Sequence, residues 1–401
     1  MSDRPTGYLF EARLPAARRR LRLGMVGGGR GAFIGAVHAL AARMDNRWEL
    51  VAGCLSSDPE RARLSAADWF LPADRSYADY RSMAAAEAAR PDGIDAVAVT
   101  TPNDTHHDIC QVFLERGIDV ICDKPLTTTL ADAVALVRSV RRRGLVFVVT
   151  HGFAAYPMVR QARRMVADGA LGTLRLVHVE YLQDWLTTPL EAGGNKQAEW
   201  RTDPARSGPG GCIADIGTHA YHLARFVTGR EATRLSAQLH SFVPGRRVDD
   251  NAHVLLAFAG GLQGTLIASQ VAPGNECGLR IRVYGDAAGL EWDQEHPNQL
   301  ALTPVGQPLR ILSRGEPGLL AAAQRATRVP RGHPEGYLEA FANLYAEAAV
   351  AIEARRDGRT LEDGLLDYPT VEDGAIGVKF IESAIASSRA DGAWTDLALA
   401  L

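Results

Sequence analysis

Short apolar runs alternate with amphipathic stretches through the first third of the chain. Five apolar runs have the length of buried strands: 21–26, 48–55, 94–100, 118–122 and 145–149. Four stretches between them carry apolar residues at helical spacing: 33–43, 59–67, 105–116 and 129–143. Strands that are apolar throughout and separated by helices are typical of a parallel sheet covered on both faces. We therefore expect a doubly wound α/β domain over residues 21–150.

The pattern changes after residue 150. A helix is predicted near 157–168, and long β-like runs follow at 173–182, 233–243, 252–259, 262–271 and 279–284. Because no regular helices separate most of these runs, they favour an antiparallel sheet. Further helices are predicted near 213–228 and 335–355, and residues 297–334 predict a loop with room for one hairpin. Residues 151–401 are thus expected to form an α+β domain with a large, mainly antiparallel open sheet, while residues 1–20 form an arm.

Composition narrows the class of protein. The 401 residues carry a formal net charge of -3, which gives no reason to expect nucleic-acid or membrane binding. No apolar run approaches the roughly 20 residues of a membrane-spanning helix, and no cleavage-site pattern follows Arg18–Arg20. The five cysteines lack metal or redox spacing, so we expect reduced thiols in a cytoplasmic protein without a bound metal.

A glycine cluster follows the first predicted strand. Gly27, Gly29 and Ala32 fit the pattern G-x-G-x-x-G/A. Glycines here permit a tight turn and let backbone N–H groups approach a pyrophosphate at the N-terminus of the next helix. Because the cluster follows a strand and opens a helix, it predicts dinucleotide binding. The residues expected to contact the cofactor there are Gly27, Gly29, Arg30, Gly31, Ala32, Phe33 and Ile34.

The end of the second strand bears on which cofactor is bound. An acidic residue usually follows this strand and binds the ribose hydroxyls. Here Ser56 and Ser57 take that place, with Asp58 and Arg61 further along. We expect NAD, but NADP stays open, because serines do not repel a 2′-phosphate and Arg61 is near.

The third strand end should line the same crevice, because ligands of open α/β sheets bind beyond the carboxyl ends of the strands. Thr101, Pro102, Asn103 and His106 follow that strand and suit a loop against the cofactor. Asn103 equally suits a helix cap. No fourth ligand accompanies His106, His107 and Cys110, so these residues do not predict a metal site.

Asp123 and Lys124 follow the fourth strand. The chain has 41 arginines and only three lysines, so a lysine kept at this place hints at a need for a compact ammonium. Burial and a positive nicotinamide ring would both lower the pKa of Lys124. Such a lysine can exchange a hydrogen bond or a proton with a substrate hydroxyl.

A second glycine-rich segment, Gly208–His219, leads into a predicted helix. Asp215 and His219 are four residues apart and therefore share one helix face. An aspartate beside a histidine orients the imidazole and raises its basicity, which gives a general base near neutral pH. Taken alone, such a pair is more often a surface interaction, and zinc would need further ligands.

Taken in order, the glycine loop, the segment Asp123-Lys124-Pro125-Leu126 and the G-G-x-x-x-D-x-x-x-H segment resemble the Gfo/Idh/MocA family. This family includes glucose-fructose oxidoreductase and inositol dehydrogenases, and the resemblance runs from about residue 21 to 385. It implies a Rossmann domain followed by an α/β domain whose open sheet makes homodimers or homotetramers. It also implies that Lys124 holds the substrate hydroxyl, His219 accepts its proton and Asp215 binds substrate or His219. The family's usual Glu is Asp123 here, which keeps the carboxylate.

Other side chains are expected to shape the substrate pocket: Tyr156, Lys196, Trp200, Arg201 and His333. Trp and Arg suit a carbohydrate, because sugar rings stack on Trp and hydroxyls bind charged groups. An ordinary loop explains the run around Lys196 and Trp200 equally well, and a helix start explains His333.

We therefore expect an NAD(P)-dependent oxidoreductase that oxidises a secondary hydroxyl of a sugar, glycoside or inositol-like polyol. One alternative is an NAD-dependent glycosidase that works by oxidation, elimination, water addition and reduction. Its substrate would be an anionic, for example sulfonated, glycoside held by Arg201 or Lys196. The other alternative is a non-catalytic NAD(P)-binding regulator, which has no need of Lys124, Asp215 and His219 together.

Overall fold

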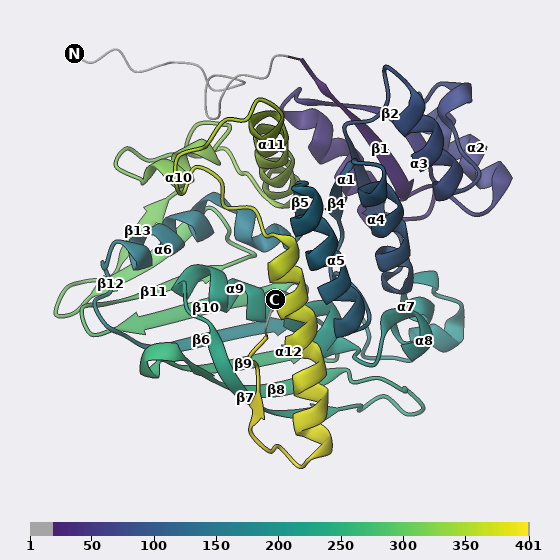
Figure 1. The fold of residues 1–401 in the computed structure, drawn as a ribbon. Helices are drawn as coiled ribbons and strands as arrows, with labels where there is room; N and C mark the ends of the chain where they lie inside the picture. The colour runs from purple at the N-terminus through teal and green to yellow at the C-terminus, as the bar shows by residue number, and fades with distance from the viewer. Residues whose placement is uncertain (1–18, 400–401) are drawn as a thin grey trace, which may run out of the picture.

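A five-stranded sheet and a nine-stranded sheet organise the computed structural model, which describes residues 19–399 (Figure 1). The expected arm, residues 1–20, lies outside the described residues except for Arg19 and Arg20. Arg19 pairs with Asp95 at 2.7 Å. None of the helices within residues 19–399 is both long and apolar enough to cross a membrane.

The first sheet is parallel throughout, with strand order β2-β1-β3-β4-β5. Its strands are β1 (Leu21–Gly27), β2 (Trp48–Cys54), β3 (Ala96–Thr100), β4 (Asp119–Cys122) and β5 (Phe147–Val149). The intervening helices are α1 (Phe33–Met44), α2 (Pro59–Asp68), α3 (Tyr80–Ala89), α4 (His106–Glu115) and α5 (Leu130–Arg143). The doubly wound sheet predicted from the apolar runs is confirmed.

The second sheet has the order β13-β12-β11-β10-β6-β9-β8-β7-β14. Its strands are β6 (Leu174–Leu182), β7 (Ala232–His240), β8 (Asn251–Phe258), β9 (Gln263–Ser269), β10 (Gly278–Gly285), β11 (Ala288–Asp293), β12 (Gln299–Pro304), β13 (Arg310–Ser313) and β14 (Thr395–Asp396). Within this second sheet, β6 and β9 are the only described strands that pair in parallel. The mainly antiparallel sheet is confirmed, and β12 and β13 form the hairpin expected within 297–334.

Further helices connect the strands of the second half of the chain. They are α6 (Pro157–Ala167), α7 (Lys196–Arg201), α8 (Pro204–Ser207) and α9 (Thr218–Thr228), with α10 (Ala321–Arg325) further along. α9 packs on β6 and on α6. The inner face of the nine-stranded sheet and these helices form one continuous core with part of the first domain.

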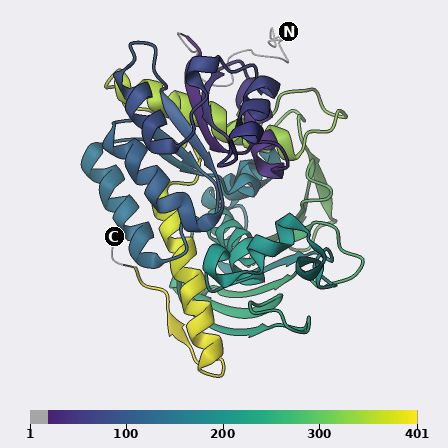
Figure 2. The same cartoon turned by 90° about the vertical axis from the view of Figure 1, so that its right-hand side faces the viewer.

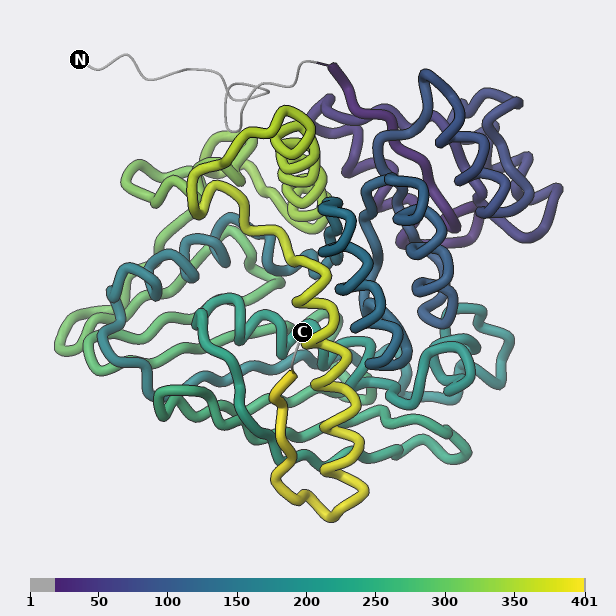
Figure 3. Tube along the Cα trace, in the orientation of Figure 1, coloured from purple at the N-terminus to yellow at the C-terminus, as the bar shows by residue number. Residues whose placement is uncertain are grey.

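Two long C-terminal helices return to the first half of the chain. α11 (Tyr337–Arg356) packs against α1, and Nε1 of Trp48 in β2 donates to the carbonyl of Tyr345 at 2.8 Å. α12 (Val371–Arg389) packs against α5 and β7 and so touches both sheets. Figures 2 and 3 show α12, in yellow, running from the first sheet to the edge of the second.

Candidate functional site

The glycine loop joins β1 to α1 in close backbone contact. Gly27 and Gly28 adopt positive φ of 84° and 75°, which an L side chain rarely tolerates. A Cβ on Gly35, the third residue of α1, would lie 2.1 Å from the Cα of Gly28. Gly35 therefore permits the tight packing of helix on loop. The sequence pattern had placed its third position at Ala32, and the glycine three residues later was the signal for this contact.

The start of α1 suits a pyrophosphate. Its N-cap, Ala32, offers no side-chain hydrogen bond, and no acidic residue lies in the first turn, which begins with Phe33 and Ile34. Uncapped amides at a helix N-terminus bind anions. The amide of Gly29 already donates to the Leu55 carbonyl at 3.0 Å, and that of Arg30 donates to Ser65 Oγ at 2.9 Å. The amides of the first helical turn thus fit NAD, while those two hold the loop in place.

The end of β2 presents serines rather than a carboxylate. Ser56 Oγ accepts from the amide of Asp58 at 3.1 Å, and Ser57 is exposed. Asp58 Oδ1 accepts from the amide of Arg61 at 2.7 Å and caps α2. The Asp58 carboxylate therefore caps α2. Ser56 and Ser57 occupy the positions after the end of β2.

The loop after β3 is tied to two other parts of the site. The ring of His106 lies between the carbonyls of Thr101, at 2.8 Å, and Pro125, at 3.0 Å. Asn103 Nδ2 donates to the carbonyl of Ser207 in α8 at 3.2 Å. Asn103 does not cap a helix with its side chain, and Pro102 precedes it as the N-cap of a short 3-10 turn. The loop thus connects the cofactor half to the second half of the chain.

Lys124 lies beyond the ends of β4 and β5, which are neighbours in the sheet. Thr150, after β5, donates its amide to the Cys122 carbonyl at 3.0 Å and its hydroxyl to Asp123 Oδ1 at 2.7 Å. Lys124 Nζ then donates to Asp215 twice, to the carbonyl oxygen at 2.6 Å and to Oδ1 at 2.7 Å. The lysine of the first half and the aspartate of the second therefore meet directly.

Asp215 is surrounded by donors. Besides Lys124, its Oδ2 accepts from Gln270 Nε2 at 2.9 Å and lies 3.5 Å from Nε of Arg201. Burial alone would raise the pKa of Asp215, but the charges of Lys124 and Arg201 and the hydrogen bonds from Lys124 and Gln270 outweigh it and lower the pKa to about 2. Asp215 is therefore ionised at neutral pH.

Asp215 and His219 do not pair as their spacing predicted. Residues Ile213–Gly217 form a π-helical turn before α9, so the four-residue spacing is not that of a regular α-helix. Among the described residues, no hydrogen bond joins the two side chains. The amides of Gly211 and Ile213 each donate to the half-buried Asp249 at 2.7 Å and hold this turn. Burial raises the pKa of Asp249 to about 6 in spite of these bonds. No motif in the sequence marked this residue.

His219 is half-buried on α9 among aromatic rings. Its ring centroid lies 4.8 Å from that of Phe153 and 6.3 Å from that of Tyr181. Burial, aided by the charge of Lys124, lowers the pKa of His219 well below its ordinary value. The imidazole is therefore neutral near pH 7 and able to accept a proton.

A small cavity adjoins these groups on the side of α7. Trp200, Arg201, Asp215 and Gln270 are among the residues that line it, and Asn103 reaches it from the loop after β3. The guanidinium of Arg201 lies 4.2 Å from the centre of the Trp200 ring. The structure thus brings Trp200 and Arg201 together with Asp215, and their role in binding substrate stays a prediction.

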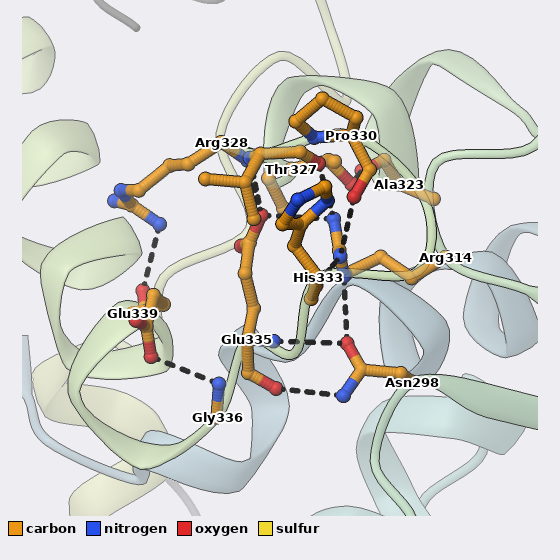
Figure 4. A network of polar contacts seen from close by, with 12 residues as sticks. Asn298, Arg314, Ala323, Thr327, Arg328, Pro330, His333, Glu335, Gly336 and Glu339 are labelled. Carbon is orange, nitrogen blue, oxygen red and sulfur yellow. Dashed lines mark hydrogen bonds and ion pairs between the residues drawn. The ribbon is translucent and has the colours of Figure 1, made fainter. Parts of the chain in front are cut away.

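Three of the predicted pocket residues lie elsewhere. Tyr156 is 2% exposed, and its ring packs against those of Phe153 and Trp292 in the core. Lys196 is exposed at the first position of α7. His333 is exposed and takes part, through its carbonyl, in the polar network shown in Figure 4. The side chains of these residues are not among those lining the cavity.

Comparison with known proteins identifies the family of the chain. An oxidoreductase family with an NAD-binding Rossmann fold matches residues 21–151, and a GFO/IDH/MocA C-terminal domain matches residues 159–291. The oxidoreductase YfiI of Bacillus subtilis is 35% identical, over 94% of this chain and 96% of its own. Levoglucosan dehydrogenase of Pseudarthrobacter phenanthrenivorans is 26% identical, over 94% of this chain and 98% of its own.

A solved structure extends the likeness to the cofactor. The inositol dehydrogenase homolog of Azotobacter vinelandii, crystallised with NAD+, is 40% identical. It covers 94% of this chain and 98% of its own, with a TM-score of 0.91. The same homolog has been solved with NADH and myo-inositol.

Proposed function

The chain belongs to the GFO/IDH/MocA family of NAD-binding oxidoreductases, and from that premise we propose that it oxidises a secondary hydroxyl of a sugar, glycoside or inositol-like polyol. One observation carries the proposal. Lys124, from the cofactor half, bonds to Asp215, while the neutral His219 lies on the helix that follows directly. A donor and a base thus stand together beyond the strand ends where such folds bind their ligands.

Lys124, His219 and Asp215 have different roles in the proposed reaction. An ammonium has three N–H donors, and Lys124 directs hydrogen bonds to two oxygens of Asp215, which leaves one donor for the substrate oxygen. Its positive charge stabilises negative charge developing on that oxygen. His219 accepts the hydroxyl proton, and Asp215 holds Lys124 in position. NAD, when bound, supplies the hydride acceptor.

The proposed substrate class is supported by the side chains around Asp215. Trp200 offers a flat apolar face, and Arg201 and Gln270 offer donors around Asp215. A ring that bears several hydroxyls suits such a lining. The relatives point the same way, since one is a levoglucosan dehydrogenase and another has been crystallised with myo-inositol.

Turnover of the purified protein with NAD tests the proposal. The panel contains myo-inositol, levoglucosan, aldohexoses and nitrophenyl glycosides, and NADH absorbance and nitrophenol release are both recorded. We expect NADH to accumulate with at least one polyol or sugar and to vanish in His219→Gln. Nitrophenol release without net NADH would instead establish the glycosidase. A protein that binds NAD but turns over none of the panel would contradict both activities.

The nine-stranded sheet is also the proposed contact between subunits. Its outer face exposes Leu176 of β6, Leu255 of β8 and Tyr284 of β10, each at least 38% exposed. These strands lie near the middle of the sheet, so the apolar side chains are not at an edge. Burial of such a face favours association. We infer a homodimer or homotetramer assembled through it.

A further inference from the structure

Two buried ring nitrogens beside the site have no hydrogen-bond partner among the described residues. They are Nδ1 of His219 and Nδ1 of His151, and His151 is only 2% exposed. Buried polar atoms in native proteins nearly always have a partner, because an unpaired one costs about 1–3 kcal/mol. Two such atoms in adjacent rings therefore need a common explanation.

The fold holds His151 against His219. His151 follows Thr150, whose bonds to Cys122 and Asp123 fix the loop beside Lys124. The His151 ring meets that of His219 edge to face, with centroids 5.6 Å apart and planes at 88°. Its flat side stacks on His222, with centroids 4.2 Å apart and planes at 4°. His219 and His222, one turn apart on α9, thus contact the same imidazole.

The other described neighbours of His219 make no hydrogen bond to its Nδ1. Phe153 has no polar side-chain atom. The hydroxyl of Tyr181 contacts Cys277 Sγ at 3.2 Å and accepts from Gln183 at 3.3 Å. The carboxylate of Asp215 is engaged by Lys124 and Gln270. His151 is the ring neighbour whose acceptor nitrogen is still unused.

We propose that His151 is a positioning residue for His219. One buried water accepts the Nδ1–H of His219 and donates to Nδ1 of His151, and this bridge holds His219 in the tautomer whose Nε2 is unprotonated. The tautomer of a histidine is set by the hydrogen bond that its other nitrogen makes. Both unpaired atoms are then satisfied at once, and Nε2 is ready to take the substrate proton. The role of this bridge in catalysis rests on the proposed function, whereas the predicted tautomer of His219 does not.

The charges around the two rings agree with this assignment. His151 must be neutral for its Nδ1 to accept. Burial lowers the pKa of His151 well below its ordinary value, and His222, Lys124 and Arg225 lower it further against the opposing charge of Asp373. Burial, Lys124, His151 and His222 all lower the pKa of His219. Both imidazoles are therefore neutral near pH 7.

Nitrogen-15 NMR of histidine-labelled protein tests the tautomer without any substrate. The His219 signals are assigned by their loss in His219→Gln. We expect the Nδ1–H form in the unaltered chain and in His151→Asn, whose amide oxygen replaces the acceptor. In His151→Leu, the Nε2–H form should grow. A His219 that is Nε2–H in the unaltered chain, or unchanged in His151→Leu, would overturn the proposal.

Turnover supplies the second readout. With NAD and an active polyol, kcat should fall about 10- to 100-fold in His151→Leu, as for other groups that orient a reactive side chain. KM should change little, and His151→Asn should recover most of the rate. His296→Leu is the matched control, because His296 is exposed after β11 and its ring bonds to Asp293. An equal loss in the Leu and Asn variants would contradict tautomer control. If no polyol is oxidised, the NMR result still decides the inference.

Discussion

At the scale of single residues, the site depends on one ammonium shared between two halves of the chain. Lys124 is 13% exposed on its side chain, and Asp215 is 22% exposed. Neither group is deeply buried, so their pairing does not carry the full desolvation penalty of an interior ion pair. The same partial exposure leaves room for a substrate oxygen beside Nζ.

Replacement of Lys124 by Met should therefore abolish most turnover. The variant keeps the length of the side chain but loses the donor and the charge that stabilise the substrate oxygen. We expect a fall of about 10²- to 10⁴-fold in kcat/KM, the usual contribution of one proton-handling group. Initial rates at saturating NAD measure this fall in kcat/KM. Lys379→Met, on α12, is the control and should keep normal rates.

The free energy of unfolding at low pH should also depend on the pair of Lys124 and Asp215. The folded pKa of Asp215, about 2, lies below the ordinary value of 3.8, so the ionised form stabilises the fold above that value. This contribution, on the order of 2 kcal/mol, is lost as the pH falls from about 4 to 2. Asp215→Asn should remove this pH dependence in denaturant titrations at pH 6 and pH 3. If the variant lost as much stability between these pH values as the parent chain, the lowered pKa of Asp215 would be contradicted.

At the scale of elements, the sequence predicted the helices and strands whose buried residues recur at regular spacing. The strands of the first sheet and β6 to β10 of the second were predicted because each buries one face or both, whereas β11 and β14 were missed. α3 was missed because its buried face includes Glu87, which binds Arg75 in the interior. The π-helical turn at Ile213–Gly217 could not be predicted either, since it depends on Asp249, a distant residue that accepts from its first amides. Lys124, Asp215 and His219 were singled out by sequence, whereas His151 required the tertiary contact.

The contact between α1 and the glycine loop gives a prediction at the same scale. In Gly35→Ala, the new methyl group would collide with the Cα of Gly28, and backbone cannot yield as a side chain does. The helix must shift away from the loop. We expect a loss of about 1–3 kcal/mol in unfolding free energy and weaker NAD binding by calorimetry.

Gly193→Ala is the matched control for this change, because a Cβ there meets nothing within 4 Å. It should preserve both stability and NAD affinity. Unaltered NAD affinity in Gly35→Ala would show that the loop does not need this close packing.

At the scale of the whole molecule, polar contacts fasten the two halves at several places. In the network of Figure 4, Arg314 and Glu335 are each buried, and Glu335 accepts from the amides of Arg328 and Val329. Arg328 pairs with Asp45 at the end of α1. The segment after β13 is thereby bound to the cofactor half, which restricts movement of one half against the other.

The outer face of the nine-stranded sheet predicts association between whole molecules. Leu255→Glu places a charge at an exposed position of β8, which a monomer tolerates and an apolar interface does not. We expect the molar mass from light scattering to fall to that of a smaller assembly. Leu309→Glu, at an exposed site between β12 and β13, is the control and should leave the mass unchanged.

The return of α11 to α1 has a consequence for how the protein is made. Trp48 is 1% exposed, and its indole is covered by Tyr345, nearly three hundred residues later in the chain. On the ribosome, the cofactor half emerges long before this cover is synthesised. That half must therefore wait, with an apolar surface uncovered, until α11 has been synthesised.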